Sequence, residues 1–186
     1  LHPRVRRQRQ MCIRDRVGGI TTASNGEIVI NGKNITSMSE KELAKFRLEN
    51  IGFVFQAYNL IPEMTAYQNI ILPLKLAHKK IDKKYLSDIC NKLSISDRLS
   101  HLPSELSGGQ QQRVAIARAL ITKPSILLCD EPTGNLDKKS SEDVLDLLTQ
   151  LCADNGCTLI LVTHDKSVAD RMGRIITISD GEISED

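Results

Sequence analysis

The sequence lacks the patterns that mark several classes of protein. It has five cysteines but no C-x-x-C pair, which argues against a disulfide framework and against a zinc site. No apolar run approaches the roughly 20 residues that a membrane-spanning helix needs. The N-terminus has no apolar segment of the kind that secretory signal peptides contain. These absences predict a cytosolic chain in a reducing compartment, with Cys90 and Cys129 as small buried hydrophobic residues.

Basic residues are concentrated at the N-terminus. The net charge of +2 combines +5 in residues 1–17, which contain six arginines, with −3 in residues 18–186. A stretch of this composition without strand or helix periodicity is either a basic arm for nucleic acid or anionic lipid, or non-native sequence. The string PRVRRQRQMCIRDR resembles translated sequencing-adapter sequence. We therefore expect residues 1–17 to be non-native, the authentic protein to begin near Gly18, and no nucleic-acid partner.

Strands and helices are predicted to alternate along residues 18–186. Three strands are apolar throughout, which favours a parallel sheet covered on both faces. Ser39, Thr65 and Asp82 have the spacing of helix N-caps, and Pro73 is expected to break or kink its helix. The turns Asn31-Gly32 and Asp180-Gly181 indicate hairpins. The apolar strands are expected at residues 51–55, 125–129 and 158–163, and helices at 39–48, from 65, from 82, at 110–121, 140–155 and 167–172.

Two carboxylates follow the strand predicted at 125–129. The apolar run places Asp130 at the carboxyl edge of a parallel sheet, where ligands of α/β proteins bind. A carboxylate there can hold magnesium, and Glu131 suits a general base that polarises an attacking water. Taken alone, the pair is also compatible with an ordinary acidic loop.

A small-residue motif precedes the helix that is expected to begin at Gln110. Gly108 and Gly109 allow close backbone approach, and a helix N-terminus offers free N–H groups to a phosphate. Ser107 adds a hydroxyl donor. The motif by itself is compatible with a simple N-cap, but Asp130 lies twenty residues after Gln110, and this combination indicates a nucleotide site.

LSGGQ followed by ILLCDEP resembles the ATP-binding cassette (ABC) ATPase family. Other strings fall in the family's order: Gln56 after IGFVF resembles the Q-loop, GNLD the D-loop, and His164 in LVTHD the switch histidine. The resemblance covers residues 18–186. It implies an α/β P-loop NTPase fold with a mainly parallel central sheet, a small antiparallel β part and a helical subdomain at about 62–118.

The resemblance implies roles for the residues of the chain's own site, with ATP and Mg²⁺ as ligands. Asp130 and Gln56 would serve the magnesium ion. Glu131 would activate the attacking water, and His164 would stabilise the γ-phosphate. A lone histidine at a strand end is more often a structural residue, but the presence of the other family motifs in this sequence favours the catalytic role of His164.

Other residues would face a second cassette, because the family pairs two cassettes head to tail around ATP. The signature of one subunit would contact the nucleotide that the other subunit holds. The signature residues are Ser107, Gly108, Gly109 and Gln110. The D-loop residues at the dimer interface are Asn135, Leu136 and Asp137.

The sequence departs from the family in its phosphate loop, G-x-x-x-x-G-K-[ST]. The string from Gly26 to Asn34 has five residues between its glycines and no Ser or Thr after Lys33, so it does not fit. We expect the loop to lie upstream and the chain to be N-terminally truncated. Without the loop's lysine and backbone N–H groups, the 186-residue chain is expected to bind Mg-ATP weakly and to hydrolyse none.

The strings FQAYNLIPEMTAYQNIILPLKLA and GNLD resemble the lipoprotein-release, macrolide-export and bacitracin-resistance branch of the family. This resemblance implies the ATP-hydrolysing subunit of a bacterial transporter, held at the inner face of the membrane by a permease. A cell-division cassette that signals without transport stays open as the alternative. A pseudo-ATPase scaffold would not need Glu131, Gln56 and His164. Chromosome-maintenance types are disfavoured because residues 57–106 lack coiled-coil heptads.

Overall fold

The computed structural model describes residues 14–179 and 182–185. The expectations for residues 1–13 and for the Asp180-Gly181 turn lie outside this part of the chain. Residues 14–17 are helical, although so short a piece shows no periodicity in the sequence. The elements that follow are β1 (Val29–Ile30), β2 (Lys33–Asn34), α2 (Glu40–Asn50), β3 (Ile51–Phe55), α3 (Ala66–Leu76), α4 (Lys83–Lys92), 3₁₀ turns at Ser96–Arg98 and Pro103–Glu105, α5 (Gly108–Leu120), β4 (Ile126–Asp130), α6 (Lys138–Asn155), β5 (Thr158–Val162), α7 (Lys166–Ala169), β6 (Ile176–Ser179) and β7 (Glu182–Glu185).

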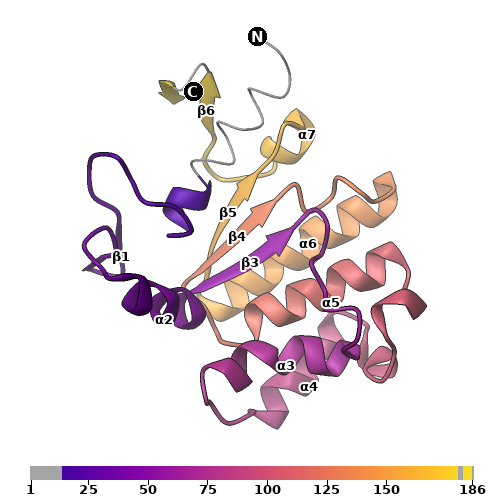
Figure 1. Cartoon of the computed structure of the whole chain (residues 1–186). Helices are drawn as coiled ribbons and strands as arrows, with labels where there is room; N and C mark the ends of the chain where they lie inside the picture. Colours follow the sequence, from indigo (N-terminus) through magenta and orange to yellow (C-terminus); the bar gives the residue numbers. More distant parts are fainter. Residues whose placement is uncertain (1–13, 180–181, 186) are drawn as a thin grey trace.

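A three-stranded parallel sheet in the order β3-β4-β5 lies at the centre of the molecule (Figure 1). Its register is level, so that Phe55, Asp130 and Val162 lie side by side at the carboxyl ends of the three strands. The prediction of a parallel sheet is confirmed. Because the strands end together, the residues that follow each of them are delivered to one edge of the sheet.

Apolar clusters pack on both faces of this sheet. Leu127 and Cys129 belong to the larger cluster, with side chains of α3, α4, α5 and α6. Leu128, between them, belongs to the second cluster, with Phe46 of α2 and Ile30 of β1. Successive strand side chains point to opposite faces, so an apolar run covers both. Figure 1 shows α5 and α6 running along one face of the sheet.

Helix ends follow the predicted capping chemistry. Ser39 and Thr65 each form a capping box at the start of α2 and α3. Asp82 accepts a hydrogen bond from a backbone N–H of the first turn of α4. Gly156 ends α6 in the left-handed conformation, with φ of 63°, which glycine adopts without strain.

Two expected helix boundaries differ in the structure. Of the break or kink expected at Pro73, the break does not occur: α3 continues to Leu76 because Ile70 and Leu74 are buried against the core and outweigh one lost backbone hydrogen bond. Helix α5 begins at Gly108 instead of Gln110, because Ser107 is its N-cap. The two glycines therefore form the first turn of the helix.

Two antiparallel pairs, β1 with β2 and β6 with β7, complete the strands. Asn31 and Gly32 join the first pair with φ of 51° and 73°, the conformation of a tight hairpin turn. No helix in the described part of the chain is long and apolar enough to cross a membrane. The four cysteines of that part, among them Cys90 and Cys129, are buried and free, as predicted.

Candidate functional site

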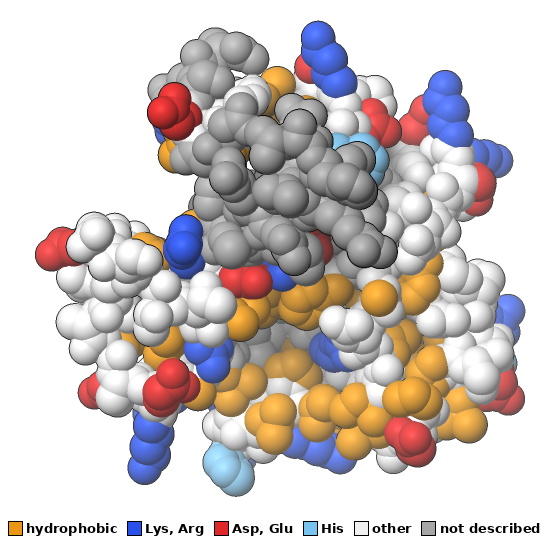
Figure 2. Space-filling view, turned by 45° about the horizontal axis from the view of Figure 1, so that its top comes forward, with side chains coloured by type: hydrophobic (Ala, Val, Ile, Leu, Met, Phe, Trp, Pro, Cys, Tyr) orange, Lys and Arg blue, Asp and Glu red, His pale blue; other side chains and the backbone are white. Residues whose placement is uncertain are grey.

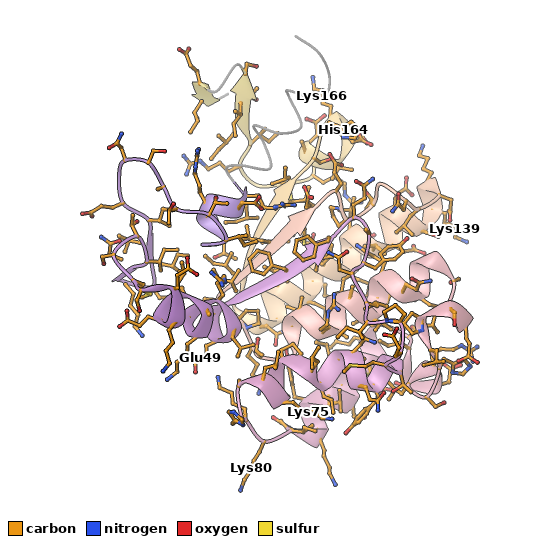
Figure 3. All side chains as sticks on the ribbon, viewed as in Figure 1. Glu49, Lys75, Lys80, Lys139, His164 and Lys166 are labelled. Carbon is orange, nitrogen blue, oxygen red and sulfur yellow. The ribbon has the colours of Figure 1, made fainter. Side chains whose placement is uncertain are left out.

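The carboxyl edge of the central sheet gathers four of the predicted site residues. Asp130 is the last residue of β4, and Gln56 and Glu131 directly follow β3 and β4. His164 follows β5. Figure 3 shows His164 at this end of the sheet, on the far side of the molecule from Lys75 in α3.

Glu131 and His164 are in direct contact. One oxygen of the Glu131 carboxylate accepts the backbone N–H of His164 at 3.0 Å and lies 2.6 Å from the ring Nδ1. The other oxygen accepts the hydroxyl of Thr163 at 3.1 Å. The Glu131 backbone adopts φ of 45°, a strained value for a residue with a side chain, and its N–H donates to the carbonyl of Val162. Glu131 is therefore held in one orientation, as a general base requires.

The carboxylate of Asp130 is paired with Arg14. The guanidinium of Arg14 contacts Oδ2 of Asp130 and is also hydrogen-bonded to Asp15. Only 7% of the Arg14 side chain is exposed, and its guanidinium carbon lies 5.6 Å from the centre of the Phe55 ring. Loss of hydration raises the pKa of Asp130 above its usual range, and Arg14 opposes that rise.

The oxygen donors of Asp130 and Gln56 are of the type that Mg²⁺ prefers. In this arrangement, however, the Asp130 carboxylate is shared with a buried guanidinium and is not free for a cation. The described residues also contain no group of three or more His, Cys, Asp or Glu side chains that could hold a metal ion. The site as folded does not fit Mg²⁺ while Arg14 stays in place.

The D-loop residues lie against Gln56. The side-chain amide of Asn135 donates to the Gln56 carbonyl at 2.8 Å. A Cβ on Gly134 would lie 2.7 Å from the Gln56 side-chain nitrogen, so glycine permits this close approach. Leu136 packs against the larger apolar cluster. Asp137 caps α6, and its hydrogen bonds with Ser140 lower its pKa.

The signature residues lie on a separate element, the first turn of α5. The Ser107 hydroxyl accepts the backbone N–H of Gln110 at 3.3 Å, and the Gln110 side chain accepts the N–H of Ser107 at 2.9 Å. Gly109 faces open space, whereas a Cβ on Gly108 would lie 3.1 Å from the Tyr58 hydroxyl. Among the described residues, no hydrogen bond joins Ser107 to Glu131 or His164. The structure thus brings the Glu131 group together and leaves the signature apart. The N–H groups of Gly108 and Gly109 come too early in the helix for an intrahelical carbonyl partner, whereas that of Gln110 is bonded to Ser107.

Two polar residues of α5 contact the loops of the site although no motif in the sequence marks them. Gln112 donates from its side-chain amide to the carbonyl of Pro132, directly after Glu131. Arg118 donates to the carbonyls of Tyr58 and Asn59, in the segment after Gln56. For Gln112, the sequence signal is a polar residue at a position where the helical spacing predicts a buried apolar one.

Known proteins resemble this chain over most of its length. The ABC transporter family matches residues 16–134. The ABC transporter ATP-binding protein YtrE of Bacillus subtilis (strain 168) is 46% identical over 155 residues, which are 82% of this chain and 67% of YtrE. The lipoprotein-releasing system ATP-binding protein LolD of Francisella tularensis subsp. holarctica (strain OSU18) is 42% identical over 90% of this chain and 74% of LolD.

A larger relative and a solved structure agree with these matches. The macrolide export ATP-binding/permease protein MacB of Bartonella quintana (strain Toulouse) is 46% identical over 91% of this chain and 26% of MacB. A dimeric post-hydrolysis structure of the ATP-binding cassette MJ0796, bound to ADP and Pi, superimposes with a TM-score of 0.83 and 37% identity, covering 95% of this chain and 80% of that one. This chain therefore belongs to the ABC transporter family, as an ATPase domain with the ABC cassette fold.

Proposed function

We propose that this sequence supplies the Glu131 edge and the signature of the ATP-hydrolysing subunit of a bacterial transporter, which exports or extracts a lipoprotein, peptide or antibiotic through a separate permease. The observation that carries the hydrolytic role is the Glu131 carboxylate, held by Thr163 and by His164 at the carboxyl edge of the sheet. The similarity to LolD and MacB supports the substrate class.

The chemistry assigned to this edge is attack of a water on the γ-phosphate of ATP. Glu131 would accept the proton of the attacking water, because its carboxylate is fixed before the substrate arrives. His164 would hold the γ-phosphate oxygens from the next strand, and Gln56 would face the same region from β3. The position of each residue at a strand end supports these roles.

The second nucleotide contact would come from another copy of the chain. The solved cassette MJ0796 is a dimer bound to ADP and Pi, which supports head-to-tail pairing here. In such a pair, Ser107, Gly108, Gly109 and Gln110 would reach the partner's nucleotide. The N–H groups of Gly108 and Gly109, at the positive end of α5, have no intrahelical carbonyl partner and suit a phosphate. Residues 134–137 would lie between the two copies.

A cavity of about 430 Å³ between α2, β3, α3 and α5 suits the permease contact. Arg47 and Arg118 contribute charge to its lining, and Phe53 and Pro73 contribute apolar surface. Figure 2 shows hydrophobic side chains gathered in the lower half of that view, with basic side chains among them. A mixed surface of this kind fits a cytoplasmic segment of a membrane protein, which would hold the chain at the inner face of the membrane.

We also infer that the 186-residue chain binds Mg-ATP weakly and hydrolyses none by itself. Arg14 pairs with Asp130, and the sequence contains no G-x-x-x-x-G-K-[ST] loop to hold the phosphates. ATP turnover that Glu131→Gln abolishes would contradict this inference. We further propose that residues 1–17 are non-native sequence and that the cassette comprises residues 18–186.

Co-purification tests the transport role. The tagged chain is expressed with the permease encoded beside its gene, and detergent-solubilised membranes are fractionated. The permease is expected to co-elute with the wild-type chain and with Glu131→Gln, because that substitution lies outside the proposed docking cavity. Loss of the permease from both eluates would refute the proposal. If the chain instead co-elutes with a membrane protein of cell division that has no transport pathway, the alternative of a cell-division cassette that signals without transport would be favoured.

A further inference from the structure

Gln112 of α5 is a buried polar side chain that the chemistry of ATP hydrolysis does not require. Its exposed fraction is 0%, and its Nε2 donates to the carbonyl of Pro132 at 2.6 Å. Its Oε1 has no hydrogen-bond partner in the part of the chain that the structure describes. A buried amide oxygen without a partner is unfavourable, so an apolar side chain of similar shape would serve packing better. What the glutamine adds is its link to Pro132.

That link joins two elements with different tasks. The signature, from the N-cap Ser107 into the first turn, opens helix α5, and Pro132 directly follows Glu131. The hydrogen bond therefore connects the helix that would serve the partner's nucleotide to the loop that would serve the chain's own.

Two further links close a ring around this contact. Asn135, in the loop after Pro132, donates to the carbonyl of Gln56 at 2.8 Å. Arg118 of α5 donates to the carbonyls of Asn59 and Tyr58 at 2.6 and 2.7 Å. Both of these carbonyl residues have positive φ, 48° and 59°, a strained backbone that needs such support.

We propose that Gln112 is a positioning residue that transmits displacement of the signature turn to the loop of Glu131. The inference rests on the proposed function, which assigns the signature turn to the partner's nucleotide and Glu131 to the chain's own. Each of the three links runs from a side chain to a backbone carbonyl, so α5, the Glu131 loop and the Gln56 segment move as one unit. Movement of the first turn of α5 then shifts the acceptor carbonyl of Pro132 and, with it, the backbone of Glu131.

Amide hydrogen exchange measured by NMR tests the link without requiring ATP turnover. The reporters are the N–H groups of Gly134 and Leu136, which donate to carbonyls within the loop at 3.0 and 3.1 Å. Gln112→Met keeps the length of the side chain and removes the donor. It is expected to speed exchange at both reporters by about tenfold, the effect of losing one hydrogen bond, and to leave the amide of Leu128 in β4 unchanged.

The matched control is Gln111→Met, one residue earlier on the same helix. The Gln111 side chain donates to Leu106 at 3.1 Å, before the signature and away from the Glu131 loop. This variant keeps both capping bonds between Ser107 and Gln110, so the signature turn stays fixed and exchange at Gly134 and Leu136 should equal that of the wild type. Equal acceleration by both substitutions would show a general loosening of α5 and would overturn the proposal.

Transmission is measured by adding Ser107→Ala, which removes the N-cap and loosens the first turn of α5. In the wild-type background this change should speed exchange at Gly134. In the Gln112→Met background it should add nothing, because the connection is already cut. An undiminished effect there would overturn the proposal, since a merely structural Gln112 would not alter the response.

Gln112→Leu replaces the methionine variant if the latter does not fold. If neither variant folds, Gln112 is a structural residue and the proposal fails. Failure of this test is distinct from failure of the proposed function, because exchange reports the link and co-purification reports the permease.

Discussion

At the scale of single residues, the pKa of Asp130 is set by opposing influences. Burial raises the pKa, Arg14 lowers it, the Glu131 and Asp15 carboxylates raise it further, and the net shift is upward. The folded state therefore holds this proton more tightly than the unfolded state. Asp130 stabilises the fold below its ordinary pKa, and this contribution is lost as the pH rises through the raised value.

We predict that Arg14→Met raises the pKa of Asp130 further, because it removes a neighbouring positive charge. The pH at which the stabilising contribution of protonated Asp130 is lost then becomes higher. Titration of the Asp130 carboxyl carbon by NMR measures the shift. Arg16→Met removes the same charge from a residue that is not among the causes of the Asp130 shift, and should leave the titration unchanged. Identical titrations for the wild type and Arg14→Met would show that the guanidinium does not govern this carboxylate.

At the scale of elements, the contact of β3 with α5 depends on Gly52. A Cβ at this position would lie 2.5 Å from the backbone oxygen of Ala119 and 2.9 Å from a methyl of Leu127. Because a backbone atom of a packed helix cannot give way cheaply, Gly52→Ala is expected to lower the free energy of unfolding by about 2–3 kcal/mol. Urea denaturation measures this change.

Gly109→Ala is the matched control for that substitution. Gly109 lies in the first turn of α5 and would place a Cβ in open space. The free energy of unfolding should stay the same or rise by about 0.5 kcal/mol, because alanine loses less conformational entropy than glycine. A Gly52→Ala variant as stable as Gly109→Ala would mean that α5 does not lie as close to β3 as the structure places it.

The elements could be predicted from the sequence where local chemistry decides them. Apolar runs and capping residues such as Ser39 act over a few positions, so they can be recognised without a structure. The start of α5 was misplaced because the low helix propensity of Gly108 and Gly109 hides the capping by Ser107. Of the break or kink expected at Pro73, the break does not occur because tertiary burial outweighs one lost hydrogen bond.

The site could be predicted in part for the same reason. Gln56, Glu131 and His164 follow apolar strands, and parallel strands end at one edge, so their convergence follows from topology. The links of Gln112 and Arg118 could not be predicted, because each depends on where a loop carbonyl lies in space. The pairing of Arg14 with Asp130 likewise joins residues that no local pattern relates.

At the scale of the whole molecule, one apolar cluster connects the helical part to the sheet. Cys90 on α4, Cys129 on β4 and Cys152 on α6 all belong to it. Their membership of a single cluster implies that the helices at 66–92 do not unfold independently of the central sheet. The two regions that would bind the permease and the nucleotide are thus parts of one cooperative unit.

Thiol labelling in urea tests this cooperativity. Burial raises the pKa of Cys90 to about 11 and that of Cys129 higher still, so both thiols are unreactive while they are buried. In variants that keep one of these cysteines and replace the others with alanine, we predict that each thiol becomes reactive at the urea midpoint of its own variant's loss of circular dichroism. Labelling of Cys90 well below that midpoint would show that α4 opens first. In that case the helical part could unfold while the sheet stays folded, and only the contacts of α5 would couple the helical part to the sheet.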